Sequence, residues 1–226
     1  AEMIDEHGYV PLLDEKDLVE VVDDEMIKNK VMGVDPAGEG RDEAKWVVRD
    51  PFKIKVAATE KLSTPKGMAQ RTMTIMIEEN IPPHKVYVDS FGVGAALIGE
   101  LAKAGVAVNA VNVGDRMKTG TEDAERFYNK RAWMFWELRD WAKHGGTFVK
   151  NPNWKELFGI KYRAELNRKL KIMSKDEMRR KGIMSPNTAD AAMLTFSEGK
   201  DIMGNFKEYN VGNVRTSGDG DKFSAI

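Results

Sequence analysis

The feature that most constrains the fold of this chain is a series of short apolar runs, separated first by tight turns and later by helical patterns. The runs lie at 31–34, 45–48, 52–58, 85–88 and 106–113. The first three follow one another closely, which predicts an antiparallel meander. Helical periodicity at 66–79 and 93–104 separates the later runs, which predicts parallel crossover connections. The pattern therefore predicts an α/β protein with a mixed β-sheet flanked by helices.

The second half of the chain is richer in helical patterns. We expect the longest helix at 122–143, a helical turn followed by a basic β-hairpin within 154–174, and a short helix at 175–181. A last helix should run from Ser185 to about Glu198, with Ser185 as its N-cap and Pro186 in its first position. The basic hairpin is then an insertion before the last helix.

Charge is distributed unevenly along the chain, although the net charge is only −1. Residues 1–25 carry ten acidic side chains and one basic one, so the other 201 residues carry a net charge of +8. Residues 161–181 alone hold nine bases and three acids. We predict an acidic linker or arm at 1–29, one folded domain at 30–199 and a flexible tail at 200–226. A basic body favours a polyanionic partner, and a solvated basic face is the alternative.

Composition excludes several classes of protein. The chain has 226 residues and no cysteine, which excludes disulfide scaffolds, thiolate nucleophiles, Cys-bound zinc and iron–sulfur clusters. No apolar run approaches the ~20 residues of a membrane helix, and the acidic start does not resemble a signal peptide. We therefore expect no membrane association. Apolar residues make up 42% of the chain, which is enough to build a core.

Two carboxylates stand out because each directly follows an apolar strand. Asp35 ends the run 31–34, and Asp89 ends the run 85–88. If these strands are parallel neighbours, both acids emerge at the same edge of the sheet, which is where open α/β sheets bind ligands. The alternative interpretation is that each Asp caps the turn that follows it.

Two further acids are candidates for the same site. Asp190 lies in the last helix between Ala189 and Ala191, small residues that permit close approach to another element. Its alternative role is an interaction with the positive end of the helix dipole. Asp42 follows a Gly-rich turn that could bring it back towards Asp35, and it is a weaker candidate. Such a set of oxygen ligands suits Mg²⁺ or Mn²⁺ better than zinc.

Several of these motifs, taken in order, resemble one protein family. They are 34–42 (Val-Asp-Pro-Ala-Gly-Glu-Gly-Arg-Asp), 86–90 (Val-Tyr-Val-Asp-Ser), Lys175, and 185–191 (Ser-Pro-Asn-Thr-Ala-Asp-Ala). Together they resemble the nuclease domain of the large terminase subunit of tailed bacteriophages, which has an RNase H/resolvase-like fold. The resemblance extends from about Val31 to Glu198.

The resemblance implies an endonuclease that cuts concatemeric viral double-stranded DNA during genome packaging, by two-metal-ion phosphodiester hydrolysis. The family's catalytic, metal-binding acids fall on Asp35, Asp89 and Asp190, and an extra acid that some members use falls on Asp42. Asp35 is then the candidate to bridge both Mg²⁺ or Mn²⁺ ions. The family's additional acid beside the third ligand is not matched, because alanines flank Asp190.

The resemblance also implies partners. Members of the family carry an ATPase motor and work with a portal and a small terminase subunit in the cytoplasm of the host cell. The phosphate-binding loop Gly-x-x-x-x-Gly-Lys-Ser/Thr of such a motor is not found in this sequence. We therefore expect an excised or separately encoded nuclease half, monomeric as an isolated domain.

Two other functions stay open at the level of sequence. A non-catalytic DNA-binding or motor-docking domain could keep the same fold. The segment 35–40 could also be the phosphate loop of an actin-like nucleotide-binding module. The glycines at 92 and 94 imitate a dinucleotide-binding turn, but Leu97 stands where that fingerprint requires glycine. We interpret these glycines as permitting a tight turn beside Asp89.

We expect the basic segment to contact the DNA backbone and so to give little sequence preference. The candidate DNA-binding residues are Arg168, Lys169, Lys171, Lys175, Arg179 and Arg180. Affinity for duplex DNA should fall steeply with salt, with a log–log slope of about −0.9 for each neutralised phosphate. Fluorescence anisotropy across a salt series measures this slope, and a flat response would contradict the assignment.

Overall fold

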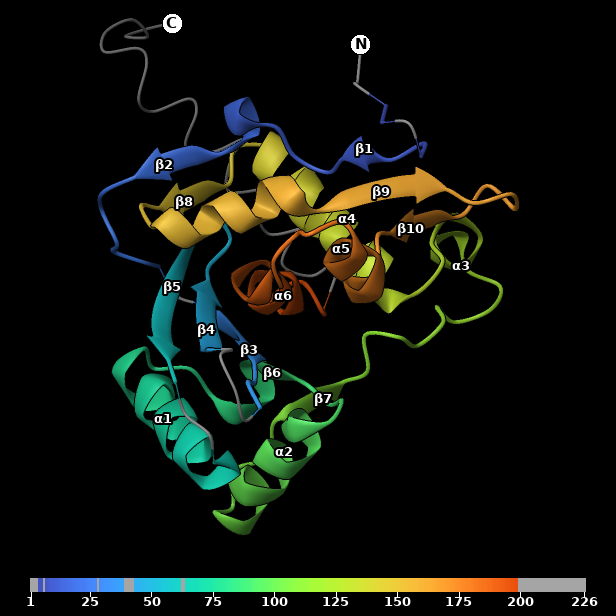
Figure 1. The fold of residues 1–226 in the computed structure, drawn as a ribbon. Coiled ribbons are helices and arrows are strands. Elements are labelled where there is room, and N and C mark those ends of the chain that lie inside the picture. The colour runs from blue at the N-terminus through green and yellow to red at the C-terminus, as the bar shows by residue number, and fades with distance from the viewer. Residues whose placement is uncertain (1–3, 6, 28, 39–42, 62–63, 199–226) are drawn as a thin grey trace, which may run out of the picture.

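The centre of the protein is a seven-stranded mixed sheet. The computed structural model describes residues 4, 5, 7–27, 29–38, 43–61 and 64–198. The strands of this sheet are β2 (Val19–Val21), β3 (Val31–Asp35), β4 (Ala44–Arg49), β5 (Lys53–Glu60), β6 (Val86–Asp89), β7 (Asn109–Val111) and β8 (Thr147–Val149). Their order across the sheet is β2-β8-β5-β4-β3-β6-β7 (Figure 1). The predicted mixed α/β architecture is confirmed.

The pairing of the strands follows the predicted connections. β3, β4 and β5 form an antiparallel meander. β6 lies parallel to β3, and β7 lies parallel to β6, so the two crossover connections are confirmed. Strands β2 and β8 are not apparent from the sequence pattern; they are three residues long and pair with each other in parallel. Such short strands leave too few residues for a period-2 pattern to be visible.

Helices cover both faces of the sheet (Figure 1). The helices are α1 (Pro65–Glu78), α2 (Val93–Lys103), α3 (Glu122–Arg126), α4 (Lys130–Lys143), α5 (Lys175–Arg180) and α6 (Asn187–Leu194), with 3₁₀ helices η1 (Glu15–Asp17), η2 (Pro83–Lys85) and η3 (Pro152–Gly159). α1 and α2 cover the face that carries Met32 and Val34, whereas α4 and α6 cover the face that carries Val31 and Val47. The alternation follows from the two-residue period of β3 and β4. No helix in these described residues is long and apolar enough to cross a membrane.

The single helix expected at 122–143 is instead two helices with a break at 127–129. The backbone N–H of Tyr128 donates to Leu170 O at 2.9 Å, so this residue pairs with β10 (Leu170–Ile172) rather than with the helix. The side chain of Asn129 then caps α4 by accepting from Ala132 N at 3.0 Å. The apolar periodicity that suggested one helix could not reveal this long-range pairing.

A smaller sheet joins the chain's beginning to the predicted hairpin. It consists of β1 (Val10–Pro11), β9 (Lys161–Ala164) and β10, with β9 and β10 forming the expected antiparallel hairpin. The N-terminal segment differs from the expected peripheral arm in the part that the structure describes. Tyr9, Leu12 and Leu13 are buried in the core. The tail expected at 200–226 lies outside the described residues.

The start of the last helix also differs from the expectation. α6 begins at Asn187, and Pro186 rather than Ser185 is the N-cap residue. The hydroxyl of Ser185 donates to Asn187 Oδ1 at 2.6 Å, and no side chain of the helix's own leading residues caps its backbone.

The backbone of α6 packs directly on β3. A Cβ atom at Gly33 would overlap the carbonyl oxygen of Ala191 and would lie 3.0 Å from Leu194 Cβ. The small residues predicted to permit close approach therefore do so here, with glycine on the strand and alanine on the helix. Ala189, Ala191 and Ala192 are all buried.

Gly33→Ala should therefore destabilise the protein, because overpacking a filled interface costs about 1–3 kcal/mol. Urea unfolding measures the loss. The control is Gly99→Ala in α2, where a Cβ meets no atom within 4 Å and alanine favours the helix. Equal effects of the two substitutions would contradict the packing argument.

Candidate active site

The structure brings Asp35 and Asp89 to the same edge of the sheet. Asp35 is the last residue of β3, and Asp89 is the last residue of β6. The two strands are parallel neighbours, with Val34 aligned to Val88, so the next residue of each strand is the carboxylate. This is the juxtaposition that the sequence predicted from two apolar strands ending in aspartate.

Asp190 reaches this edge from helix α6. Its side chain is buried, and Oδ1 lies 3.1 Å from Arg131 Nη2 while Oδ2 lies 2.8 Å from Lys175 Nζ. Burial alone would raise the pKa of Asp190, but the positive charges of Arg131 and Lys175 lower it below its ordinary value. Asp190 is therefore an ionised carboxylate held between two cations.

Asp35 has the opposite electrostatic environment. Its side chain is buried, and none of the described residues donates a hydrogen bond to its carboxylate. The pKa of Asp35 is raised to about 8, mainly by burial and also by the negative charges of Asp190, Asp89 and Glu156, against the opposing effect of Lys175. Burying a carboxylate without a partner is costly, which favours its protonated form or a bound cation.

Asp89 both lies at the edge of the sheet beside Asp35 and caps the turn that follows it, so the two interpretations from the sequence hold together. Its Oδ1 accepts a hydrogen bond from Phe91 N at 3.1 Å, so it caps the turn before α2. Burial raises its pKa above the ordinary value, and the Phe91 N–H opposes this. A Cβ at Gly94 would overlap the carbonyl oxygen of Asp89, so glycine is required for the tight turn, as expected.

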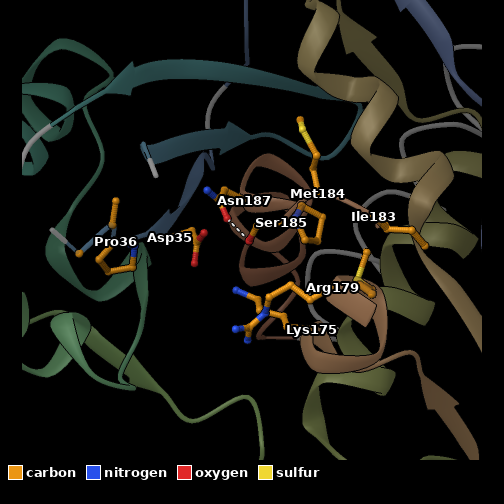
Figure 2. Close-up of a pocket in the computed structure, with 12 residues that line it drawn as sticks. Asp35, Pro36, Lys175, Arg179, Ile183, Met184, Ser185 and Asn187 are labelled. Carbon is orange, nitrogen blue, oxygen red and sulfur yellow. Dashed lines mark hydrogen bonds between the residues drawn. The ribbon is translucent and has the colours of Figure 1, made fainter. Parts of the chain in front are cut away.

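A cavity of about 470 Å³ opens beside Asp35. Figure 2 shows Asp35 and Pro36 on one wall, with Lys175 and Arg179 projecting from α5 on the other. Met178, Ile183 and Met184 supply apolar lining. Burial alone would lower the pKa of Lys175, but Asp190 and Asp35 raise it, so its ammonium stays charged. The cavity thus presents acidic and basic groups across a gap.

The three predicted acids share this region, but they are not arranged as a finished metal site. Within the described ranges, no group of three or more His, Cys, Asp or Glu side chains is positioned to hold a metal ion. Lys175 occupies one oxygen of Asp190. Asp42, the weaker candidate, lies outside the described residues.

The predicted DNA-binding bases lie on two elements, the β9–β10 hairpin and helix α5, and those of α5 include two that line the cavity, Lys175 and Arg179. In the hairpin, Lys171 lies directly opposite Arg163, so both share one face. Glu165 partly neutralises this face, at 3.2 Å from Arg163 Nη2 and 3.7 Å from Lys171 Nζ. The turn of the hairpin places Arg168 at a positive φ of 63° with its side chain exposed. Lys169, the next residue, is half-buried.

The remaining bases of the set project from α5. Arg179 and Arg180 are exposed, and Arg179 pairs with Asp176 at 2.7 Å. Lys175 differs from the others, because it contacts Asp190 within the site and is not only a surface base.

Sequence reasoning missed two residues of the site. Arg131, in the first turn of α4, donates to Asp190 and to Met173 O. Glu156, in η3, accepts hydrogen bonds from Thr188 and Ala189 at the start of α6. Burial raises the pKa of Glu156 against the opposing effect of these hydrogen bonds. No local motif marks either residue, since each finds its partner only in the folded chain.

Comparison with known proteins gives a match in structure but not in sequence. No protein-family model matches the chain, and no curated protein does. The nuclease domain of the large terminase subunit of bacterial virus Sf6 superimposes with a TM-score of 0.64 at 23% identity, covering 74% of this chain and 86% of that domain. A variant of that domain with manganese and β-thujaplicinol gives a TM-score of 0.63 at 24% identity, with the same coverage of 74% and 86%.

A more distant structural match is also a large terminase nuclease. The large terminase nuclease of the thermophilic phage G20c gives a TM-score of 0.54 at 14% identity, covering 81% of this chain and 95% of that one. These similarities concern the fold. The chain therefore has the RNase H-like fold of the nuclease domains of bacteriophage large terminase subunits, as its motifs predicted.

Proposed function

We propose that this chain is a metal-dependent endodeoxyribonuclease that cuts concatemeric viral double-stranded DNA during genome packaging. The observation that carries the proposal is the meeting of three acids on this fold. Asp35 and Asp89 end adjacent parallel strands, and Asp190, on the helix packed on β3, is near enough for its charge to raise the pKa of Asp35. The similar folds of terminase nuclease domains from Sf6 and G20c support it.

The chemistry of the donors fits a divalent cation. Asp35 is buried among other negative charges, and a cation would offset the repulsion that raises its pKa. The carboxylates of Asp35, Asp89 and Asp190 would hold Mg²⁺ or Mn²⁺, and we propose two ions. When bound, such ions polarise a phosphate and activate water for hydrolysis. Related structures with bound manganese and magnesium support divalent metal use.

The chain's own cations have separate roles in this proposal. Arg131 and Lys175 hold Asp190 ionised and in place. Lys175 and Arg179 face the cavity, where they can receive the DNA backbone. The hairpin bases, with Arg168 at the tip, extend the contact to neighbouring phosphates. Contacts to phosphates carry little sequence information, so cleavage should have weak sequence preference.

The setting of the reaction is part of the same proposal. By its resemblance to the family, the domain would work with an ATPase motor, a portal and a small terminase subunit in the cytoplasm of the host cell. An isolated copy would be monomeric. The solved structures that match this fold are nuclease domains, which favours a nuclease function over an actin-like nucleotide-binding module.

A non-catalytic DNA-binding or motor-docking domain is the second candidate. One observation favours it: Asp190 is already neutralised by Arg131 and Lys175, and the described acids do not form a ready metal site. The two candidates differ in one outcome, which is cleavage.

Supercoiled plasmid should be nicked and linearised with Mg²⁺ or Mn²⁺ and left intact with chelator. Asp35→Ala and Asp190→Ala should reduce cutting to the chelator level while sparing DNA binding, because DNA contacts come from the basic residues. Asp35→Ala should also fold well, since it removes a buried carboxylate without a described hydrogen-bond partner.

The matched control is Asp24→Ala, which removes an exposed carboxylate outside the helices and strands. It should cut like the wild type. Cutting that survives both active-site substitutions would show that other residues catalyse. Tight DNA binding by a folded protein without cutting under any metal would favour the non-catalytic candidate.

Protein stability in chelator should depend on pH through Asp35. Its pKa is raised from an ordinary value near 3.8 to about 8 in the folded protein. Between these values the folded state holds a proton that the unfolded chain releases, so this group's contribution to stability is lost as pH rises. Asp35→Asn removes this contribution.

The measurement is urea unfolding of both proteins from pH 4 to pH 8 with chelator present. The stability of Asp35→Asn relative to the wild type should increase steadily across this range. Parallel curves for the two proteins would show that Asp35 titrates normally.

A further inference from the structure

Helix α6 begins without a cap from its own segment. Its N-cap residue is Pro186, which has no side-chain oxygen to accept from the helix. The first N–H groups of a helix have no partner within the helix, so an end buried in the protein needs acceptors from elsewhere. Thr188 and Ala189, the second and third residues of α6, are completely buried.

Glu156 supplies the missing acceptors from a distant part of the chain. Its Oε2 accepts from Thr188 N at 2.7 Å and from Ala189 N at 3.3 Å. Its Oε1 accepts from Thr188 Oγ1 at 3.0 Å. A carboxylate at this end is also favoured by the helix dipole. One side chain therefore satisfies the groups that an N-cap residue would normally satisfy.

The element that carries Glu156 is itself firmly packed. Trp154 and Leu157, on either side of Glu156 in η3, are completely buried. The indole Nε1 of Trp154 donates to Val149 O at 2.8 Å, which ties η3 to strand β8. Glu156 therefore holds the start of α6 to a fixed part of the fold.

Asp190 follows in the same turn of the helix. Its backbone N–H donates to Pro186 O at 2.8 Å, so the backbone position of Asp190 depends on the turn that Glu156 holds. Arg131 and Lys175 contact the other end of this residue, its carboxylate. The backbone and the side chain of Asp190 are thus held by different elements.

We propose that Glu156 is a positioning residue for the active site. It holds the first turn of α6 and thereby sets where the Asp190 carboxylate lies relative to Asp35. This inference rests on the proposed function, because the carboxylates must act together for the position of Asp190 to matter. Glu156 contacts neither the other acids nor the cavity lining through a hydrogen bond in the described residues.

The test compares Glu156→Ala and Glu156→Gln with the wild type. Mn²⁺ affinity is measured by calorimetry without DNA, and amide hydrogen exchange is measured over 187–194. In Glu156→Ala, the amides of Thr188 and Ala189 should exchange faster and Mn²⁺ should bind about 10- to 100-fold more weakly, as when other supports of metal ligands are removed. Glutamine keeps an acceptor oxygen, so Glu156→Gln should recover most of both properties.

The matched control for a general loss of stability is Thr72→Val in α1. Thr72 Oγ1 accepts from Trp46 Nε1 at 2.9 Å in the core on the opposite face of the sheet. This variant should lower the thermal midpoint without changing Mn²⁺ affinity or exchange in α6. If Thr72→Val weakens Mn²⁺ binding as Glu156→Ala does, the effect is only structural and the proposal is overturned.

The remaining outcomes separate this inference from the proposed function. If the wild type binds Mn²⁺ and cuts DNA while Glu156→Ala matches it in affinity and exchange, the positioning role is wrong and the nuclease function stands. If the wild type neither binds Mn²⁺ nor cuts DNA, the nuclease function fails and the positioning role fails with it. Faster exchange in Glu156→Ala would then establish a helix anchor alone.

Discussion

The close packing of helix α6 on strand β3 is the constraint on which the site depends. Gly33 has no side chain, so the carbonyl oxygen of Ala191 can approach the strand directly. A side chain at position 33 would overlap the backbone of α6 and would hold the helix further from the strand end. The contact brings Asp190, one residue before Ala191, towards the edge where Asp35 ends β3. The position of Asp190 at the edge of the sheet therefore depends on the close backbone contact between Gly33 and Ala191.

That packing gathers more negative charge than a protein interior can hold without compensation. Asp190 is compensated by Arg131 and Lys175, and its pKa is lowered, whereas the pKa of Asp35 is raised. The difference arises because the two cations contact Asp190 and only the longer-range field of Lys175 reaches Asp35. A site with one ionised and one protonated acid can accept a divalent cation by releasing a proton. In the proposed nuclease, metal binding would therefore strengthen as pH rises towards the pKa of Asp35.

The sequence predicted those features that depend on local patterns. The runs 31–34 and 85–88 predicted strands followed directly by Asp35 and Asp89, and the helical patterns between strands predicted parallel neighbours; the observed strands are Val31–Asp35 and Val86–Asp89. Glu156 and Arg131 could not be found in this way, because their partners lie 32 or more residues away and no motif links them. The break at Tyr128 was hidden for the same reason, since its cause is the backbone of Leu170. Local periodicity indicates which face of a helix or strand is apolar. It does not indicate which distant residue forms the hydrogen bonds of a buried polar group.

The uneven charge of the chain also acquires a physical explanation. Acidic residues of the N-terminal segment pair with bases of the body, as Asp5 does with Lys161, Asp17 with Lys143 and Asp23 with Lys53. Tyr9 Oη donates to Glu177, whose carboxylate also accepts from Ser174 and completes the cap of α5. α5 in turn carries Lys175, which contacts Asp190. These contacts form one continuous path, which connects the described part of the N-terminal segment to the helix that carries Lys175.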